Sequence, residues 1–200
     1  MQNENGLIIL AKAPEKGNVK TRLKKHLQDD ERLRLYTYLL EKTISKLKDL
    51  SSIDSFICYS PKNAAPYFRR FGPGIFPQVR GGIGIRMFSA IERLFMMGYQ
   101  RVALVGVDIP ELSADIVLKG FDLLQDHDVV FGPAHDGGYY LVGMNRPARE
   151  IFEQIQWSTD TTLKESVRRT ASLGLSIGYT DLLRDIDRVE DLDHFRGFIP

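Results

Sequence analysis

The sequence predicts an α/β protein built on a single-domain, doubly wound, mostly parallel β-sheet with a small antiparallel insertion. Short strand-type runs alternate with longer helix-type segments along the 200 residues, which is typical of βαβ units. The first run, "LIILA" at 7–11, is apolar throughout, as in a strand covered on both faces. The hydrophobic fraction of 43% is ordinary for a globular protein, and the length fits one domain over 1–200.

Strands and helices alternate regularly in the first half of the chain. Leu33, Tyr36, Leu40, Ile44 and Leu47 recur at spacings of three and four residues, which indicates an amphipathic helix. The other predicted segments are strands at 7–11, 54–60 and 74–79, a weak helix with an internal proline at 63–71, and a helix at 85–95 that Gly98 ends.

The second half continues the alternation but reverses one strand. The paired glycines Gly137 and Gly138, followed by the aromatic run "YYLVG", indicate an antiparallel strand. Ser113 is the expected N-cap of one helix, and Thr162 with Glu165 form the capping-box pattern of another. The predicted segments are strands at 101–106, 128–132, 138–144 and 175–180, and helices at 113–125 and 161–174.

Ligands of such sheets bind at the carboxyl ends of the strands, so the loops there are the first candidates for a site. The loop "AKAPEKGNVKTRL" at 11–23 gathers Lys12, Lys16, Lys20 and Arg22. Gly17 permits a tight turn, and we expect a helix to begin near Val19 or Lys20 and to present its N-terminus to an anion. Lysine and arginine both suit phosphate oxygens.

This loop is therefore a predicted phosphate site, with a solvated basic turn as the alternative. On the first interpretation Lys20 and Arg22 contact the anion, are at least partly exposed, and can be removed without loss of the fold. Ala11, Lys12, Ala13 and Gly17 would approach the nucleotide through the backbone or side chain.

A carboxylate follows the most apolar strand, in "VGVDIPEL" at 105–112. Asp108 at this place needs a cation or hydrogen bonds, and Mg²⁺ or Mn²⁺ bridging to phosphate oxygens would supply the charge. The alternative is that Asp108 only caps a turn or helix. Asp187, in "RDIDRVEDL" at 184–192, could be the second metal ligand, or could instead open a last helix.

Two glycine-containing turns are weaker candidates. In "GPAHDGGYYLVG" at 132–143, Asp136 and the glycine pair allow a substrate close to the backbone, but a plain hairpin explains the same residues. "RGGIG" at 80–84 has no third glycine at the place that a dinucleotide fingerprint requires and lies far from the first strand, so Gly81 and Gly82 could at most form a turn that faces a nucleotide.

Several function classes are disfavoured by the composition. A net charge of +1 makes the chain as a whole a poor polyanion binder, so we expect no nucleic-acid partner. No apolar run approaches the ~20 residues of a membrane span, and no secretory signal is recognisable, so we expect a cytoplasmic protein. The sequence has no CxxC or HExxH motif and no Ser-His-Asp signature, and its four histidines are scattered, which disfavours zinc hydrolases.

Five motifs together resemble a known family. They are "LIILAKAPEKGNVKTRL", "VALVGVDIPEL", "DVVFGPAHDGGYYLVGM", "WSTDTTL" and "DIDRVEDL". In this order they are similar to the radical-SAM/selenodomain-associated transferases, which are described as glycosyltransferase-like and have the GT-A nucleotide-diphospho-sugar transferase fold. The resemblance implies that Lys20 and Arg22 contact donor phosphates, that Asp108 holds the metal and that the 80–84 turn lies near the base or ribose.

The leading hypothesis is a metal-dependent transferase that uses a nucleotide-activated donor, most simply a glycosyltransferase with a nucleotide-diphospho-sugar. The small-molecule acceptor would enter over Gly137, Gly138 and Tyr139, with Asp136 orienting or deprotonating its hydroxyl. The first alternative is a nucleotidyltransferase, in which a phosphorylated acceptor attacks the α-phosphate of an NTP. The second is a nucleotide-binding module without turnover.

Overall fold

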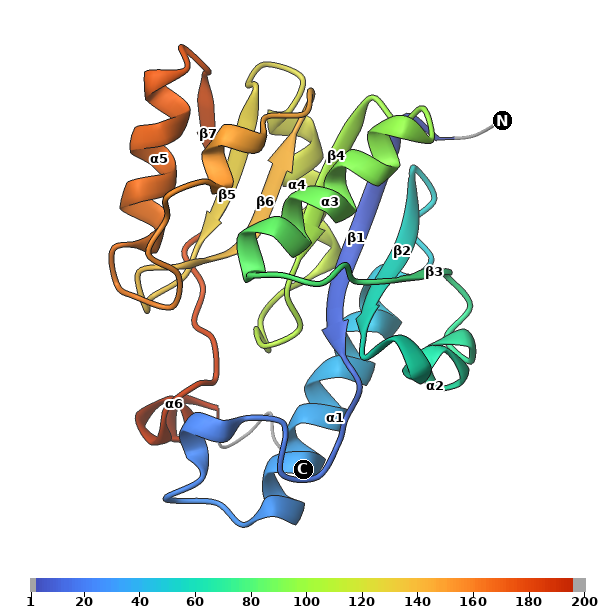
Figure 1. Ribbon diagram of the computed structural model, residues 1–200, viewed down its shortest axis with the longest axis vertical. Coiled ribbons are helices and arrows are strands. Elements are labelled where there is room, and N and C mark those ends of the chain that lie inside the picture. Colours follow the sequence, from blue (N-terminus) through green and yellow to red (C-terminus); the bar gives the residue numbers. More distant parts are fainter. Residues whose placement is uncertain (1–2, 196–200) are drawn as a thin grey trace.

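The computed structural model describes residues 3–195 and contains one seven-stranded sheet in the order β3-β2-β1-β4-β6-β5-β7 (Figure 1). All neighbouring strands are parallel except β6, which is antiparallel to both β4 and β5. The strands are β1 (Asn5–Lys12), β2 (Ile53–Ser60), β3 (Gly74–Pro77), β4 (Arg101–Val105), β5 (Val129–Pro133), β6 (Tyr139–Met144) and β7 (Ile177–Tyr179). The predicted fold class, including its antiparallel insertion, is confirmed.

Helices cover both faces of this sheet. The α-helices are α1 (Asp29–Leu47), α2 (Ala65–Arg69), α3 (Ile83–Met96), α4 (Ala114–Leu123), α5 (Thr162–Ser172) and α6 (Val189–His194). The 3₁₀ turns are η1 (Thr21–Leu23), η2 (Lys62–Ala64) and η3 (Arg149–Phe152). None of the helices among residues 3–195 is long and apolar enough to cross a bilayer.

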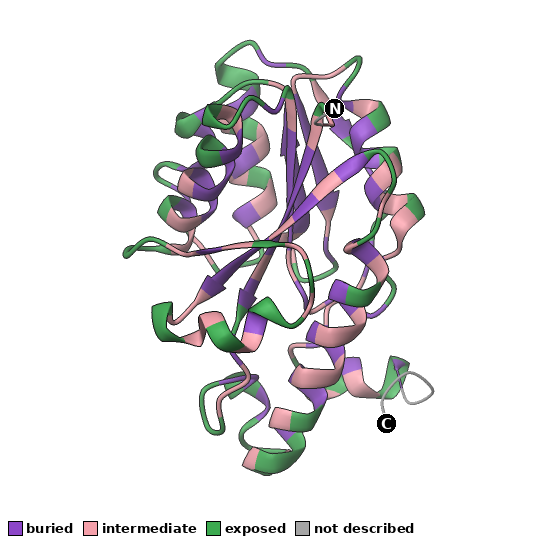
Figure 2. Cartoon of the chain, turned by 90° about the vertical axis from the view of Figure 1, so that its right-hand side faces the viewer, coloured by how far each residue is buried: buried purple, intermediate pink, exposed green. Residues whose placement is uncertain are grey.

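The period-two pattern of β1 divides its side chains between two cores. Leu7 and Ile9 pack with the apolar faces of α1 and α4, whereas Ile8 packs with α3 on the opposite face. All three are fully buried, which is worth about 1.5–3 kcal/mol for each side chain. Figure 2 shows burial concentrated along the strands and the inward faces of the helices.

A third, smaller cluster fixes the segments beyond the carboxyl ends of the strands. Leu23 of the basic loop, Leu35 and Leu39 of α1, and Ile186 and Phe195 of the C-terminal segment pack together. Figure 1 shows the basic loop and α6 beside one another below the sheet. The loop that leaves β1 is therefore held against residues that come far later in the sequence.

Two local predictions need correction. The helix expected near Val19 or Lys20 is only the 3₁₀ helix η1, which begins at Thr21 because Lys20 before it has left-handed backbone angles (φ 47°, ψ 45°). The predicted capping box does not form, because α5 is preceded by Thr161 and Thr162 lies inside it. The Thr162 hydroxyl instead donates to the carbonyls of Gln156 and Thr159, both at 2.9 Å.

Candidate active site

A cavity of about 360 Å³ lies over the basic loop, at the carboxyl ends of β1 and β4. Four basic side chains line it. Lys12, Lys20 and Arg22 come from the predicted basic loop, and Arg86 comes from α3. Its polar lining includes Lys12, Asn18, Lys20, Arg22, Gln78, Arg86, Asp108 and Asp187. The loops after β1 and β4 therefore converge as the sheet topology predicts.

Lys20 is the buried centre of this region. Its Nζ lies 2.5 Å from Asp108 Oδ1 and 3.4 Å from Asp187 Oδ1, and it donates to the Ile186 carbonyl at 2.5 Å. Only 3% of the Lys20 side chain is exposed, so the prediction of partial exposure is wrong for this residue. The reason is tertiary: the segment around Ile186 covers the loop. Arg22 is 47% exposed, as predicted, and pairs with Asp187 at 2.7 Å.

The charge of Lys20 is maintained despite its burial. Burial acts to lower the pKa of its ammonium, but the carboxylates of Asp108 and then Asp187 outweigh this effect and raise the pKa above its ordinary value. The cation that the sequence analysis required beside Asp108 is therefore supplied, at least in part, by the protein itself.

Arg32 and Tyr36 of α1 hold the loop, and neither role was predicted from the sequence. The fully buried Arg32 guanidinium donates to the Val19 carbonyl at 2.9 Å and forms an ion pair with Asp29. The Tyr36 hydroxyl accepts from the Lys12 amide at 3.0 Å and donates to its carbonyl at 2.9 Å. Arg32 lies one helical turn before Tyr36 on the buried face, so the helical spacing carried a signal for it.

The two predicted metal ligands, Asp108 and Asp187, both form ion pairs with the Lys20 ammonium. Among residues 3–195, no three side chains of Asp, Glu, His or Cys are grouped closely enough to hold a metal ion by themselves. Mg²⁺ is often bound by only one or two carboxylates together with substrate phosphates. Asp108 and Asp187 therefore fit a divalent cation in the presence of a bound phosphate, but not as a site of their own.

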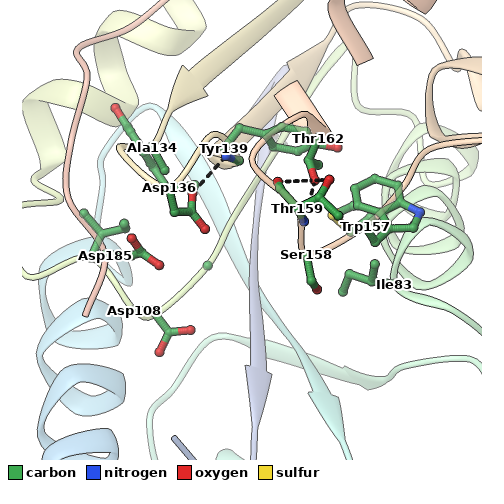
Figure 3. Close-up of a pocket in the computed structure, with 15 residues that line it drawn as sticks. Ile83, Asp108, Ala134, Asp136, Tyr139, Trp157, Ser158, Thr159, Thr162 and Asp185 are labelled. Atoms are coloured by element: carbon green, nitrogen blue, oxygen red, sulfur yellow. Dashed lines mark hydrogen bonds between the residues drawn. The ribbon is translucent and has the colours of Figure 1, made fainter. Parts of the chain in front are cut away.

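A second cavity, of about 210 Å³, shares Ile83, Gly106 and Asp108 with the first. Figure 3 shows Asp108, Asp136 and Asp185 on one side of it, and Trp157, Ser158 and Ile83 on the other. A third cavity, of about 540 Å³, adjoins it through Asp136, Ser158, Thr159 and Asp185, and its basic lining side chains are Arg22, His135, Arg184 and Arg188.

The glycine pair connects β5 and β6 in a tight turn packed against residues 159–163. Gly137 has φ +86°, and a Cβ there would lie 2.1 Å from the Asp160 carbonyl oxygen. The Gly137 carbonyl also accepts from the Leu163 amide at 2.9 Å. At Gly138 a Cβ would lie 3.0 Å from Asp136 Oδ1, and the Gly138 amide donates to that oxygen at 2.8 Å. Gly137 is thus required by the protein's own packing.

We expect Gly137→Ala to destabilise the protein by about 2–4 kcal/mol, because a left-handed backbone cost of about 1 kcal/mol adds to a backbone clash. Gly72→Ala is the matched control, since Gly72 has φ +98° but nothing within 4 Å of the added Cβ. Urea denaturation of both variants gives the comparison. Equal losses for the two would show that only backbone angles matter at Gly137.

Asp185 is a functional candidate that the sequence analysis did not select. Burial raises the pKa of its carboxyl to about 7; the carboxylates of Asp136 and Asp187 add to the rise, and Lys20 opposes it. Asp185 lines both the second and the third cavity. The sequence offered no sign of its burial, because that depends on the packing of residues 183–187 beside the β5–β6 turn.

Asp185 should make stability depend on pH. The folded protein keeps this proton up to about pH 7, whereas an unfolded carboxyl releases it near pH 4, so the folded state binds more protons in between. Stability therefore falls as pH rises through this window, and the loss is complete above about pH 7. Asp185→Asn should raise the melting temperature relative to wild type at about pH 8 but not at about pH 4. A difference that is the same at both values, as expected for the exposed Asp122→Asn, would contradict this prediction.

Comparison with known proteins assigns the family. Residues 43–159 match the family described as "Uncharacterized protein conserved in bacteria (DUF2064)". The chain belongs to this family. No curated protein matches the sequence. The association with radical-SAM or selenodomain proteins, which the resemblance implies, stays a prediction.

Solved structures share the fold of this DUF2064 protein. A candidate nucleotide-diphospho-sugar transferase from Desulfovibrio desulfuricans G20 is 32% identical, with a TM-score of 0.89 over 96% of this chain and 86% of that one. CMP:2-keto-3-deoxy-manno-octonic acid synthetase complexed with CTP is 9% identical (TM-score 0.63; 96% and 97% covered). 4-Diphosphocytidyl-2C-methyl-D-erythritol synthase from Anaerococcus prevotii DSM 20548 is 11% identical (TM-score 0.60; 98% and 96% covered). The likeness to the last two shows the fold alone.

The structure brings only some of the predicted nucleotide-binding residues of this DUF2064 protein together. Ala11, Lys12, Lys20 and Arg22 line the cavity over the basic loop, whereas Ala13, Gly17, Gly81 and Gly82 are not among its lining residues. Gly82 instead precedes α3 and lines a separate pocket beside Trp157. In the 80–86 region, Ile83 and Arg86 line this cavity, whereas Gly81 and Gly82 were expected to do so. The roles of all these residues stay predictions.

Proposed function

We propose that this protein is a cytoplasmic transferase that uses a nucleotide-activated donor, and that the donor is a nucleotide-diphospho-sugar. The observation that carries the proposal is the meeting of two cavities of opposite character at Asp108. The larger one is lined by four basic side chains, and the smaller by three carboxylates, two hydroxyl-bearing residues of the 158–159 turn and an indole. A donor with a charged nucleotide half and an uncharged sugar half matches this division.

The basic cavity would hold the diphosphate. Lys12, Lys20, Arg22 and Arg86 line it, and charge-assisted hydrogen bonds from such groups are the usual means of holding phosphate oxygens. Gln78 stands among them, where its amide already donates to the Ala11 carbonyl at 2.9 Å. The similarity to the candidate nucleotide-diphospho-sugar transferase from Desulfovibrio desulfuricans G20 supports the same choice of donor.

We propose Asp108 and Asp187 as ligands of Mg²⁺ or Mn²⁺ that binds with the donor. Their carboxylate oxygens are hard ligands of the kind these ions prefer, and both face the Lys20 ammonium. When bound, the ion would supply positive charge to the departing diphosphate. Lys20 and Arg22 would support it from the protein side by stabilising the same charge without rearrangement.

The chemical step would be the transfer of the sugar to an acceptor hydroxyl. The acceptor approaches over the β5–β6 turn, where Gly137, Gly138 and Tyr139 lie, and Asp136 takes its proton. The oxygen forms a bond to the anomeric carbon while the bond from that carbon to the β-phosphate oxygen breaks, and the electron pair leaves on the diphosphate. The position of Asp136 in the lining of both the second and the third cavity supports this proposal.

Nucleotidyl transfer is the second candidate, and two observations favour it. Four cations can neutralise a triphosphate as well as a diphosphate. The third cavity contains Arg22, Arg184 and Arg188, which could hold the phosphate of a phosphorylated acceptor. The distantly similar synthetase that was solved with CTP has this fold but does not assign the reaction. A module without turnover is the remaining candidate.

A thermal-shift screen with nucleoside triphosphates, nucleoside diphosphates and nucleotide sugars, each with and without Mg²⁺ or Mn²⁺, tests the proposal. We expect a nucleotide sugar plus metal to raise the melting temperature most, by an amount that grows with ligand concentration over Kd. Stronger stabilisation by a triphosphate, with pyrophosphate released when phosphorylated acceptors are added, would favour nucleotidyl transfer instead. Binding that survives Asp108→Asn unchanged, without turnover, would favour the module.

A further inference from the structure

The smaller cavity has a charge pattern that its neighbours lack. Asp108, Asp136 and Asp185 form one wall, and none of the described residues that line this cavity is basic. Of the three carboxyl groups, that of Asp108 is paired with the Lys20 ammonium. Its volume of about 210 Å³ lies below the ~300 Å³ at which pockets for drug-sized ligands begin. The cavity therefore suits one ring of a ligand and not a whole nucleotide.

The opposite wall is an aromatic ring that is fixed before any ligand arrives. The Trp157 indole stacks on Phe152 (centroids 6.5 Å apart, 18° between planes) and meets the edge of Tyr139 at 6.2 Å. A Cβ at Gly84 of α3 would lie 2.8 Å from the indole, so the helix contacts it closely as well. The ring is only partly buried and lines the cavity. A ligand face that packs on it loses little conformational freedom in the protein.

The segment after Trp157 is held equally firmly. Ser158 has φ 64°, an uncommon left-handed conformation for a residue other than glycine. The Thr159 hydroxyl donates to the Gln156 carbonyl at 2.8 Å, and the Thr162 hydroxyl donates to the same carbonyl and to that of Thr159. Figure 3 shows Ser158 and Thr159 beside Trp157 at the edge of the cavity. The "WSTDTT" motif thus builds one wall of the cavity.

We propose that this cavity binds an uncharged or positively charged hydroxylated ring and rejects rings that carry a phosphate or a carboxylate. The hydroxyls of such a ring donate to Asp136 and Asp185, and its C–H face packs on the Trp157 indole. An added anionic group would face the carboxylates of Asp108 and Asp136, and none of the described residues that line the cavity is basic, so its binding is unfavourable. The inference rests on the proposed function in taking the donor's sugar as the occupant, and it adds which sugars are accepted.

The single tryptophan of the chain is Trp157, so tryptophan emission reports on the surroundings of this one residue, which are this cavity and the pocket that Gly82 lines. Wild-type protein is titrated with glucose, glucosamine, glucose 6-phosphate and glucuronic acid at constant ionic strength. We expect saturable changes in Trp157 emission with glucose or glucosamine, and none with the two acidic sugars over the same concentrations. The absence of a saturable change with both non-acidic sugars, or an equal response to an acidic one, overturns the proposal.

Variants of Asp136 and Trp157, each with a control, test whether these two side chains contact the ligand. Asp136→Asn removes one negative charge and should reduce the discrimination against glucuronic acid severalfold, whereas the exposed Asp122→Asn on α4 should leave it unchanged. Trp157→Ala should weaken binding of the stabilising nucleotide sugar roughly tenfold relative to Trp157→Phe, measured by calorimetry. Unchanged discrimination in Asp136→Asn, or equal affinity of the two Trp157 variants, counts against the cavity walls assigned here.

The outcomes for the cavity and for the proposed function are distinguishable. If no nucleotide and no nucleotide sugar raises the melting temperature, the proposed donor is wrong, but the titration with free sugars still decides what the cavity accepts. If nucleotide sugars bind while glucose 6-phosphate and glucose change Trp157 emission alike, the donor proposal stands and the charge selection fails.

Discussion

Asp108→Asn is expected to abolish metal-dependent turnover while the protein still folds. Asparagine keeps the shape and can accept a hydrogen bond from Lys20, and Asp187 still pairs with this buried ammonium, so the loss of stability should be about 1–3 kcal/mol. Turnover should fall by at least about 100-fold, because the divalent ion that would stabilise the charge of the leaving diphosphate loses one of its two proposed carboxylate ligands. Steady-state rates with the donor found by thermal shift, over a range of Mg²⁺ concentrations, measure this directly.

Asp187→Asn is the companion variant. Asp187 lies farther from Lys20 than Asp108 does, at 3.4 Å against 2.5 Å, and also pairs with Arg22. We therefore expect the same loss in weaker form, with a higher metal concentration needed for half-maximal rate. Full metal-stimulated activity in Asp108→Asn would place the metal site elsewhere and remove the basis of the mechanism.

Lys20→Met should cost both stability and nucleotide binding. Methionine keeps the length of the buried stem but leaves Asp108 and Asp187 without their shared cation. Breaking a fully buried pair costs about 3–5 kcal/mol, and because these carboxylates are partly solvated we expect about 1–3 kcal/mol. Nucleotide affinity should fall at least tenfold, a loss of about 1.4 kcal/mol, since the phosphates lose their most buried cation.

Lys16→Met provides the matched control for Lys20. Lys16 belongs to the same loop, but its side chain is 59% exposed and pairs with Asp30 at the surface. This variant should change stability by less than about 0.5 kcal/mol and leave nucleotide affinity almost unchanged. Urea denaturation and calorimetry of the two variants decide the matter: equal effects would mean that burial of Lys20 has no special role.

The sequence predicted the scaffold well because the scaffold depends on local patterns. Helical spacing predicted α1, and the uninterrupted apolar run predicted β1 between two cores. The antiparallel β6 followed from the glycine pair. These features are encoded within single segments, and the sheet topology then determines which loops converge.

The details of the site depended on contacts that no local pattern contains. Lys20 is buried because the Ile186 carbonyl, 166 positions later, lies against its ammonium. The pKa of Asp185 is raised because the folded chain buries its carboxyl near the carboxylates of Asp136 and Asp187. Trp157 was noted only as part of a motif, because its place opposite Asp136 requires the packing of Gly137 against Asp160. The burial of Arg32 could have been predicted from the sequence, because helical spacing puts it on the same face of α1 as Tyr36.

The contact of Lys20 with residues 186–187 also sets an order of events during synthesis. The ribosome makes the basic loop early, and the strands β1 to β4 can pair while later residues are still being added. Until the segment that contains Ile186 has emerged, the Lys20 ammonium lacks the carbonyl and the Asp187 carboxylate that enclose it. A partly made chain can therefore have most of the sheet while the Lys20 ammonium is still not enclosed, and the proposed phosphate site would be complete only after synthesis has passed this point.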